Sequence, residues 1–564
     1  MADPHPPPSL AQALAATAAR YPERGILLFD TRGRRESWRT YPEILAAARS
    51  TAARWRGLGL APGDCLLIAR PTDWSFIDCW LGAVTAGALP VAVAPGAGMG
   101  AARAQSARVE ALVERLDARF ALTSEAFRDL AGANAAHRTA EIARTFEEVT
   151  AATPARLDAV PSAPEATAFL QLTSGSTGHQ RAVEISNRAA LHNALAFDEA
   201  IREPLGAAPG DRPRWTVSWL PLNHDLGLVG GLIQSLVVGR NLCLLPSHAF
   251  LLRPELWLEQ IAARGSVVSY SPNFALNTCV ERLAETPGGE LDLSSLRALI
   301  CGAEMIRADT IAAFEDRLTP MGLRPAAVRP GYGLAEATVA VTVDGKGQGV
   351  RTRRLPGGFD RALGIDEVVC TGRPVRDTEV RIAGPDGRAK EDDGIGEVEV
   401  RGPGLFSGYF RDPEATRESF TADGWLRTGD LAFLHGGELY LTGRRKDLLI
   451  IRGQNFMPEE FEWIAESVGG GGGTLRAGAF SVARDRAGEQ AVLVVEVAER
   501  EESERALLAA EIRDRVGRTL SLTLGDLVLV RRGRIPKTTS GKVRRGALRR
   551  MYLEGELGED RPPG

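Results

Sequence analysis

The sequence predicts an α/β fold in which a large N-terminal domain of layered α/β subdomains and a β-rich subdomain precede a small α+β C-terminal domain. Three observations predict it. Short apolar runs rich in β-branched residues alternate with helical patterns over most of the chain. From about residue 375 the strands become shorter and are separated by turns. After Gly443, the charged segment RRKD leads into a separate series of helices and strands.

The first region alternates strand patterns with helix patterns. Residues 41–58 have helical periodicity, whereas four apolar runs have the length of buried strands: 65–69, 242–245, 267–270 and 296–301. Alternation of this kind builds layers of helices over parallel strands. The uncharged stretch 79–100 could suggest a membrane span, but it contains Pro90 and Pro95. We expect a helix, a turn and a buried strand there.

The later regions have a different texture. Strand patterns at 380–382, 398–400 and 439–441 predict the β-rich subdomain, at about 375–443. We place the domain boundary at 444–447, so that the large domain covers 1–443 and the small domain 444–564. The small domain should contain a helix at 458–468, a five-glycine loop at 469–473, a strand at 491–498 and a helix at 503–516.

Composition limits the function classes. The net charge of −4 and a pI near 6.1 give no general electrostatic basis for binding nucleic acid. The six cysteines are scattered, mostly in apolar runs, and form no CxxC pair, so we expect buried thiols in a reducing compartment. The first ten residues, MADPHPPPSL, lack the basic patch and apolar core of a signal peptide. These features predict a cytoplasmic protein.

A loop rich in hydroxyl groups and glycine follows an apolar strand pattern, in the segment FLQLTSGSTGHQRAVEISN at 169–187. Its glycines allow backbone N–H groups to converge, and its hydroxyls add donors, which suits a polyphosphate. The loop residues are Thr173, Ser174, Gly175, Ser176, Thr177 and Gly178. A Walker loop is excluded because His179 and Gln180 stand where that motif has Lys and Ser or Thr. A plain turn is the simpler alternative.

Further motifs accompany this loop: GAE from Gly302, GYGLAE from Gly331, LRTGD from Leu426, GRRKD from Gly443 and PKTTSGK ending at Lys542. Over nearly the whole chain, their order and spacing resemble the adenylate-forming superfamily of acyl-CoA synthetases, peptide-synthetase adenylation domains and luciferases. The segments WLPLNHDLGLVGG, SPNFALN and KDLLIIRGQN look most like the fatty acyl-AMP ligase branch.

The resemblance implies an ATP-dependent and Mg²⁺-dependent acid–thiol ligase. A carboxylate, fatty or otherwise hydrophobic, attacks the α-phosphorus of ATP and gives an acyl adenylate and pyrophosphate. The acyl group then passes to a thiol. The first candidate for this thiol is the phosphopantetheine of a carrier protein in a secondary-metabolite pathway. Because an anion approaches a polyanion, such a site needs fixed cations. The resemblance assigns catalytic roles to Lys542, His224 and Arg181.

The resemblance also assigns binding roles. Glu336 would hold Mg²⁺, with phosphates and water as its other ligands. Lys446 would mark the hinge of a mobile small domain, whose rotation delivers and then withdraws Lys542. Besides the loop, the nucleotide-binding residues would be Gly302, Ala303, Glu304, Tyr332, Gly333, Asp430 and Arg444. In this set Tyr332 would stack on adenine, and Asp430 would grip the ribose hydroxyls.

Each of these residues also has a simpler interpretation. Tyr332 is typical of a core tyrosine, and Asp430 of a turn cap after Gly429. Glu336 suits the first turn of a helix, and His224 suits a structural histidine. Lys542 lies in a basic tail that could be a solvated face.

Departures from the family pattern leave alternatives open. The family usually continues its phosphate loop with Pro-Lys-Gly, where this chain has Gln180, Arg181 and Ala182. Asn223 stands where the fatty acyl-AMP ligase branch often has an aromatic residue. The region 344–370 looks shorter than the insertion that disfavours coenzyme A in that branch. The alternatives are an acyl-CoA ligase, an enzyme of the thioester half-reaction only, and a non-catalytic nucleotide or acyl sensor.

Overall fold

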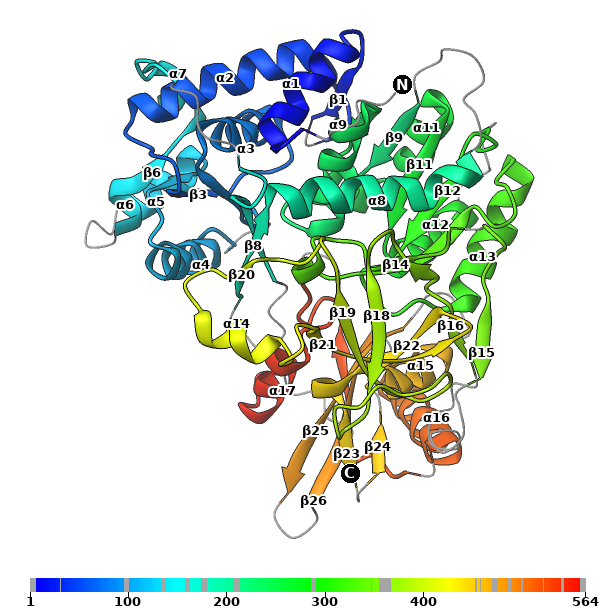
Figure 1. Ribbon diagram of the computed structural model, residues 1–564. Coiled ribbons are helices and arrows are strands. Elements are labelled where there is room, and N and C mark those ends of the chain that lie inside the picture. Colours follow the sequence, from blue (N-terminus) through cyan, green and yellow to red (C-terminus); the bar gives the residue numbers. More distant parts are fainter. Residues whose placement is uncertain are drawn as a thin grey trace.

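The computed structural model describes most of the chain between residues 7 and 557. The described residues are 7–30, 32–95, 101–132, 138–157, 163–173, 180–205, 214–285, 291–345, 347–354, 367–451, 454–456, 458–468, 475–484, 488–498, 501–520, 522–538 and 542–557. Blue-to-green elements form the upper bulk of the molecule, and orange and red elements gather below it (Figure 1).

A nine-stranded sheet forms the largest layer. Its six central strands are parallel, and strands at both edges are antiparallel. Its order is β17 (Arg373–Pro374), β14 (Thr342–Val343), β13 (Val328–Tyr332), β12 (Ala298–Cys301), β11 (Ser266–Ser271), β9 (Trp215–Ser218), β10 (Asn241–Leu244), β1 (Gly25–Phe29) and β2 (Glu36–Thr40). The parallel strands predicted in the first region are confirmed, although β12 begins at Ala298 rather than at residue 296.

A seven-stranded sheet forms the second layer, with a parallel centre and an antiparallel edge. Its order is β20 (Gly408–Tyr409), β8 (Ala182–Ser186), β7 (Thr167–Leu172), β4 (Leu89–Ala92), β3 (Cys65–Ile68), β5 (Phe120–Leu122) and β6 (Ala143–Arg144). The helix and strand expected within the uncharged stretch are α3 (Trp74–Ala86) and β4. The end of that stretch, at 96–100, lies outside the described residues.

Helices cover both large sheets. The helix α2 (Tyr41–Gly57) begins with a capping box, in which Thr40 and Glu43 satisfy each other's backbone N–H groups. The other helices here are α1 (Leu10–Arg20), α4 (Ala101–Leu116), α5 (Glu125–Gly132), α6 (Arg138–Ile142), α7 (Phe146–Ala151), α8 (Asn187–Leu205), α9 (Gln234–Val238), α10 (Ser247–Leu252), α11 (Glu255–Arg264), α12 (Asn273–Glu285) and α13 (Ala308–Leu318). The buried segment η1 (Leu226–Ile233) is a π-helix.

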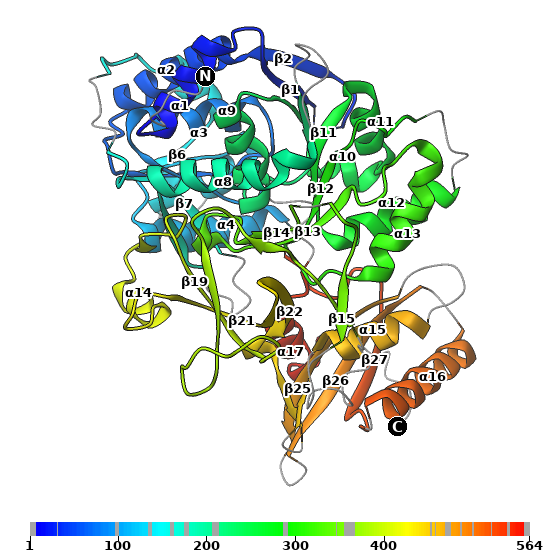
Figure 2. The ribbon, with the colours of Figure 1, turned by 45° about the vertical axis from the view of Figure 1, so that its right-hand side comes forward.

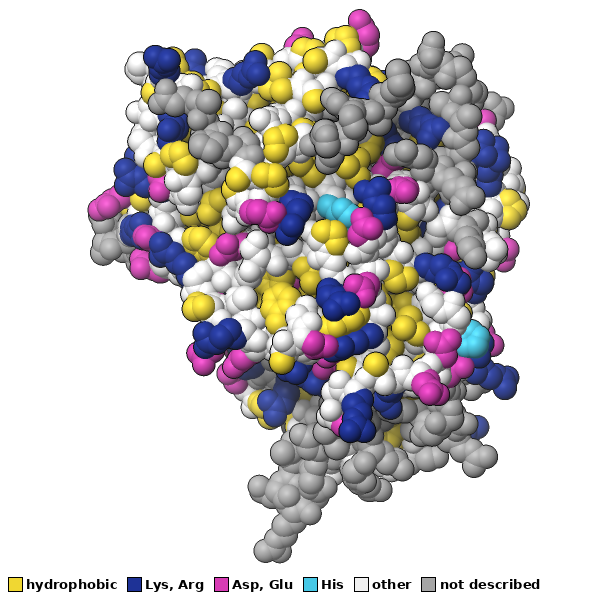
Figure 3. Space-filling model, in the orientation of Figure 1, with side chains coloured by type: hydrophobic (Ala, Val, Ile, Leu, Met, Phe, Trp, Pro, Cys, Tyr) yellow, Lys and Arg dark blue, Asp and Glu magenta, His cyan; other side chains and the backbone are white. Residues whose placement is uncertain are grey.

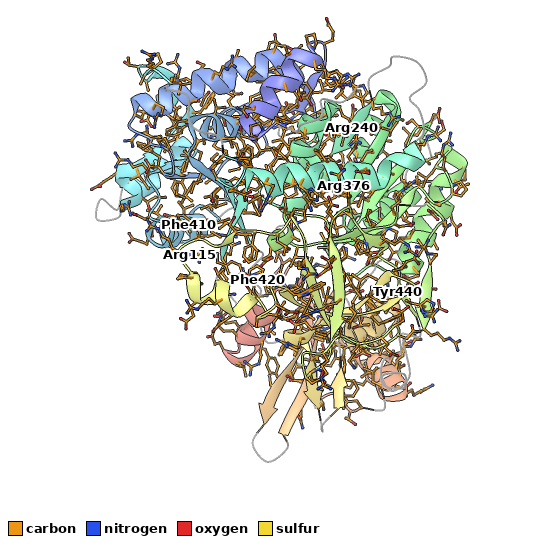
Figure 4. All side chains as sticks on the ribbon, in the orientation of Figure 1. Arg115, Arg240, Arg376, Phe410, Phe420 and Tyr440 are labelled. Carbon is orange, nitrogen blue, oxygen red and sulfur yellow. The ribbon has the colours of Figure 1, made fainter. Side chains whose placement is uncertain are left out.

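The β-rich subdomain is a four-stranded antiparallel sheet. Its order is β18 (Glu379–Ala383), β19 (Gly396–Arg401), β21 (Leu426–His435) and β22 (Glu438–Arg444). The short strands β15 (Thr352–Arg354) and β16 (Glu367–Val369) pair beside it. Between β20 and β21, the helix α14 (Pro413–Ser419) lies between Phe410 and Phe420 in the chain (Figure 4).

The last elements form the small domain. Its sheet joins β25 (Arg476–Arg484), β26 (Gly488–Val497) and β27 (Asp526–Arg531), and a hairpin joins β23 (Leu449–Ile451) and β24 (Gln454–Phe456). Its helices are α15 (Pro458–Val468), α16 (Glu502–Leu520) and α17 (Arg545–Leu553). The helix predicted at 503–516 is therefore longer, and the five-glycine loop lies outside the described residues. Figure 2 shows α15 on the side nearer the upper bulk.

The buried side chains separate in the same way. Two hydrophobic clusters contain only small-domain residues, and the remaining clusters contain only residues before Arg444. These layers confirm the predicted α/β fold class. All six cysteines are buried and unpaired, as expected. Within the described part of the chain, no helix has the length and apolar character needed to cross a bilayer.

Candidate active site

A cavity of about 480 Å³ lies where the large and small domains meet. Segments after the parallel strands β12 and β13 form one wall, as expected for α/β sheets, whose ligands bind at the carboxyl ends of strands. The middle of β21, the end of β22, and α15, β25 and the loop that carries Lys542 in the small domain form the others. Seven predicted site residues line this cavity: Ala303, Glu304, Tyr332, Gly333, Asp430, Arg444 and Lys542.

Asp430 is a buried carboxylate of the cavity that is held through both of its oxygens. Its side chain accepts hydrogen bonds from the Tyr332 hydroxyl at 2.7 Å and from Arg444 Nε at 2.7 Å. The residue is only 5% exposed. The carboxylate raises the pKa of Arg444, and burial followed by the Asp430 charge raises the pKa of Tyr332. This geometry fixes both carboxylate oxygens, each of which keeps a second lone pair for a ligand hydroxyl.

Tyr332 combines a core role with a site role. Its ring packs in an apolar cluster with Val341 and Val398, while its hydroxyl orients Asp430. Gly333 is required by close backbone approach, since a Cβ there would lie 1.6 Å from the Val339 carbonyl oxygen. Gly302 is not among the described residues that line the cavity. Its N–H donates to the Ser271 carbonyl oxygen.

Glu304 contributes a second carboxylate to the cavity. Its Oε1 accepts a hydrogen bond from the Phe274 N–H, 2.6 Å away, at the first turn of α12. Burial raises its pKa to about 7, against the opposing effects of this N–H and of Lys542 and Lys537.

Lys542 reaches the cavity from the small domain. Its backbone is held by Thr538, which donates its N–H to the Lys542 carbonyl oxygen at 2.8 Å and accepts from the Lys542 N–H at 3.1 Å. Burial, followed by the Arg444 charge, lowers the pKa of the Lys542 ammonium. The charges of Asp225, Asp430 and Glu304 oppose this change. Lys542 is partly buried and lines the cavity with Asp430 and Glu304, so it is not part of a fully solvated face.

His224 lies in a smaller cavity next to the first. The volume of this cavity is about 20 Å³, and its apolar walls include Trp219, Leu226 and Phe274. Phe274 and Ala303 also line the larger cavity, so the two spaces adjoin. His224 Nδ1 lies 2.6 Å from Asp225 Oδ1, which orients the ring.

The glycines beside His224 have structural reasons. A Cβ on Gly227 would lie 2.3 Å from the Pro221 carbonyl oxygen, so tight packing of η1 explains this glycine. The whole π-helix is buried. It begins directly after Asp225, whose side chain accepts the N–H of Leu226.

The phosphate loop is described only at its ends. Two hydrogen bonds join Thr173 and Arg181: the Thr173 N–H donates to the Arg181 carbonyl oxygen, and the Arg181 N–H donates to the Thr173 side-chain Oγ1. Ser174, Gly175, Ser176, Thr177 and Gly178 lie outside the described residues. The Arg181 side chain is 49% exposed, lies 4.9 Å from the centre of the Tyr409 ring and is 3.9 Å from Asp412.

Glu336 lies on η3 (Ala335–Ala337), a single 3-10 turn after β13. Its Oε1 accepts a hydrogen bond from the Tyr409 hydroxyl at 2.8 Å. Burial raises its pKa, whereas Tyr409 and Arg444 oppose this change. A divalent cation would compensate the cost of burying this carboxylate. Among the described residues, no group of three or more His, Cys, Asp and Glu side chains is placed to hold a metal ion by itself.

Lys446 lies on η4 (Arg445–Asp447), the turn between β22 and β23. Its side chain is outside the described set, so the structure gives its backbone position alone. Three residues in or next to the site were not predicted from the sequence: Asp225, Phe274 and Tyr409. The adjacent His-Asp pair in NHDLG was a signal for Asp225, but no local pattern identified the other two.

The chain is similar to known proteins along most of its length. The family model described as AMP-binding enzyme matches residues 14–410. The long-chain-fatty-acid–AMP ligase FadD26 of Mycobacterium tuberculosis is 32% identical over 97% of each chain. The 4-hydroxyphenylalkanoate adenylyltransferase of the same organism is 31% identical over 97% of this chain and 92% of the relative. A structure from a study of fatty acyl-adenylate ligases of E. coli and L. pneumophila superposes with a TM-score of 0.86 at 29% identity, covering 97% and 98% of the two chains.

Proposed function

The chain belongs to the AMP-binding enzyme family and is an adenylate-forming ligase, and on this premise we propose the acid, the acceptor and the residue roles. The protein uses ATP to convert a hydrophobic carboxylic acid into an acyl adenylate. It then transfers the acyl group to the phosphopantetheine thiol of a carrier protein. The names of its relatives, which include a fatty-acid–AMP ligase and an adenylyltransferase for 4-hydroxyphenylalkanoates, support this acid class.

One observation carries the proposal: the partly buried Lys542 lines the same cavity as Asp430, Arg444 and Tyr332. Asp430 has the two acceptor oxygens that suit vicinal ribose hydroxyls. A compact ammonium can neutralise charge on both the attacking carboxylate and the α-phosphate, and this charge changes most in the transition state. Lys542 is therefore placed to accelerate adenylation rather than to strengthen ATP binding.

The small apolar cavity is the proposed entrance for the acyl chain. Its walls suit a hydrophobic group, and His224 lies where the carboxylate would pass toward Lys542. The volume of about 20 Å³ is little more than one water requires, so a bound acyl group needs side chains to move. Trp219, stacked on Phe250 with ring centres 3.8 Å apart, is the first candidate to shift.

The remaining roles follow from position. The ends of the loop at Thr173 and Arg181 would face the β- and γ-phosphates, with Ser174–Gly178 between them. Glu336, oriented by Tyr409, would hold Mg²⁺, which supplies charge neutralisation of the phosphates when bound. Ala303, Glu304 and Gly333 would border the adenine, on which Tyr332 would stack, and Gly302 would support that edge.

We place the boundary between the two domains at 444–447 and the hinge at Lys446. The separation of hydrophobic clusters on either side of this turn supports the boundary. Rotation there would withdraw Lys542 and open a path for the thiol. Buried unpaired cysteines are consistent with a cytoplasmic location.

The test is acid-dependent exchange of labelled pyrophosphate into ATP across a panel of fatty, aromatic and polycyclic acids. Lys542→Ala should lower exchange by more than about 100-fold, because loss of one charge-stabilising donor typically costs 10²- to 10³-fold. Absence of exchange with every acid would overturn the proposal. A sensor or an enzyme of the thioester step alone would give that result, and preformed acyl adenylate offered with coenzyme A or a carrier protein separates the two.

A further inference from the structure

Arg307 is a large-domain side chain that contacts the small domain at the far end of the larger cavity. Its Cζ lies 5.1 Å from the centre of the Trp463 ring, and its Nη1 lies 3.7 Å from Glu466 Oε2. Trp463 and Glu466 are three residues apart on α15, so they share one face of that helix. The guanidinium therefore contacts α15 in two ways, through an aromatic face and through a carboxylate.

Contacts within the large domain also hold Arg307 in place. Its backbone N–H donates to Asn273 Oδ1 at 3.0 Å, and its Nε donates to Asp309 Oδ1 at 2.9 Å. The side chain is 24% exposed. Because these contacts restrict the rotamer, little conformational freedom is lost when the guanidinium meets α15.

The helix α15 is in turn bound to the segment that carries Lys542. Glu462 accepts two hydrogen bonds from Arg545, at 2.7 and 3.0 Å, and Glu459 lies 2.8 Å from the same guanidinium. Arg545 follows Lys542 by three residues. A displacement of α15 would therefore displace Lys542 with it.

We propose that Arg307, through Trp463 and Glu466, is a positioning residue that holds Lys542 in the cavity during adenylation and releases it for thioester formation. The inference rests on the proposed function, since it assigns Lys542 to the first step only. The contact stabilises one orientation of the small domain, so its loss should slow the step that needs this orientation and spare the step that needs another.

The experiment measures both half-reactions on the full chain with Arg307→Ala. The first assay is pyrophosphate exchange at varied ATP, and the second is consumption of supplied acyl adenylate by a carrier protein or coenzyme A. We expect the maximal exchange rate to fall about tenfold, with less than about a twofold change in KM for ATP. Thioester formation should be unchanged or faster.

Two further variants distinguish positioning from folding. Arg307→Lys keeps a cation that can lie over Trp463, so it should recover at least half of the exchange rate. Glu466→Gln should lower exchange less than Arg307→Ala, and its effect should be lost when Arg307 is already Ala. Arg324→Ala is the matched control, since Arg324 is exposed on the large domain and donates to the Ser294 carbonyl oxygen within that domain. It should leave both half-reactions unchanged.

Equal losses in both half-reactions would overturn the inference, as would a rise in KM for ATP alone, because either result would make Arg307 a general structural or nucleotide-binding residue. Exchange by Arg307→Ala at the unsubstituted rate would also overturn it while leaving the proposed function intact. An unsubstituted enzyme without exchange would instead remove the proposed function itself.

Discussion

The two ends of the proposed ATP site are built differently. At the ribose end, Asp430 is buried and held through both oxygens by Tyr332 and Arg444. At the phosphate end, Arg181 is half exposed, and its nearest carboxylate is Asp412 at 3.9 Å. The ribose end is thus organised before a nucleotide arrives, whereas Lys542, the cation that we propose for the phosphates, comes from the other domain. The proposal therefore assigns nucleotide binding and the rate of adenylation to separate groups.

The largest effect that would test this contrast is expected for Asp430→Ala. The substitution removes the proposed ribose acceptor and leaves Arg444 and Tyr332 without their shared partner. A hydrogen bond to a charged group is worth ~1.5–3 kcal/mol, so we expect kcat/KM for ATP to fall by about 100-fold. Steady-state pyrophosphate exchange at varied ATP measures it.

The matched control for that substitution is Asp423→Ala. Asp423 is an exposed carboxylate that accepts a hydrogen bond from Arg381 at 2.7 Å on the same subdomain. We expect no change in kcat/KM for ATP with this variant. Equal effects of the two substitutions would mean that the ribose end has no special role.

The next effect concerns pH. Burial and Arg444 lower the pKa of Lys542 from its ordinary value of 10.5. Because the charged form is needed, exchange should persist below the lowered pKa and fall as the pH rises through it, by about tenfold per unit beyond. In Lys542→Arg, whose guanidinium stays charged, this alkaline limb should be absent at a lower overall rate. A limb that survives in Lys542→Arg would assign the titration to another group.

A smaller effect is expected at the exposed phosphate end. Arg181→Ala should lower pyrophosphate exchange about tenfold. Arg181→Lys should restore most of the lost rate, because the position keeps the family's positive charge and does not need the bidentate geometry of a guanidinium. The losses should shrink as salt rises, because exposed charges are screened. Indifference to both substitutions would show that the loop binds phosphate without this side chain.

The smallest effect is expected for Tyr409→Phe. Loss of its hydrogen bond leaves Glu336 more easily protonated, since that bond lowers the pKa of the carboxyl. A single bond of about 1 kcal/mol predicts an approximately fivefold rise in the Mg²⁺ concentration for half-maximal exchange. Tyr440→Phe is the control, on β22 and stacked on Phe433 away from the site (Figure 4). A rise of similar size in Tyr440→Phe would show that Tyr409 has no specific role in metal binding.

Motif positions were predictable from the sequence, but their contacts were not. Strand patterns located β11 and β12, and parallel strands bring the segments that follow them to one edge. No strand was predicted at β13. The Tyr332–Asp430 hydrogen bond joins residues 98 positions apart, and no local periodicity encodes such a pair. The contact between Arg307 and Trp463 could not be predicted from the sequence for the same reason. The π-helix η1 was also missed, because a segment that is apolar on every side gives no period to measure.

The charge distribution on the surface does not distinguish the two ends of the proposed ATP site. On the face shown in Figure 3, acidic and basic side chains are interspersed. This pattern accords with the small net charge of the chain. Electrostatic selection of the nucleotide is therefore expected from the cavity rather than from a long-range field.

The burial of every cysteine has a practical consequence for following the proposed domain rotation. Burial raises the pKa of Cys65 and Cys243 to about 12, and raises those of Cys79, Cys279 and Cys301 as well. Thiols that are sealed from solvent and protonated react slowly with alkylating dyes. One cysteine introduced on the outer surface of each domain would therefore accept fluorophores selectively, and energy transfer between them would report the orientation of Lys542 in real time.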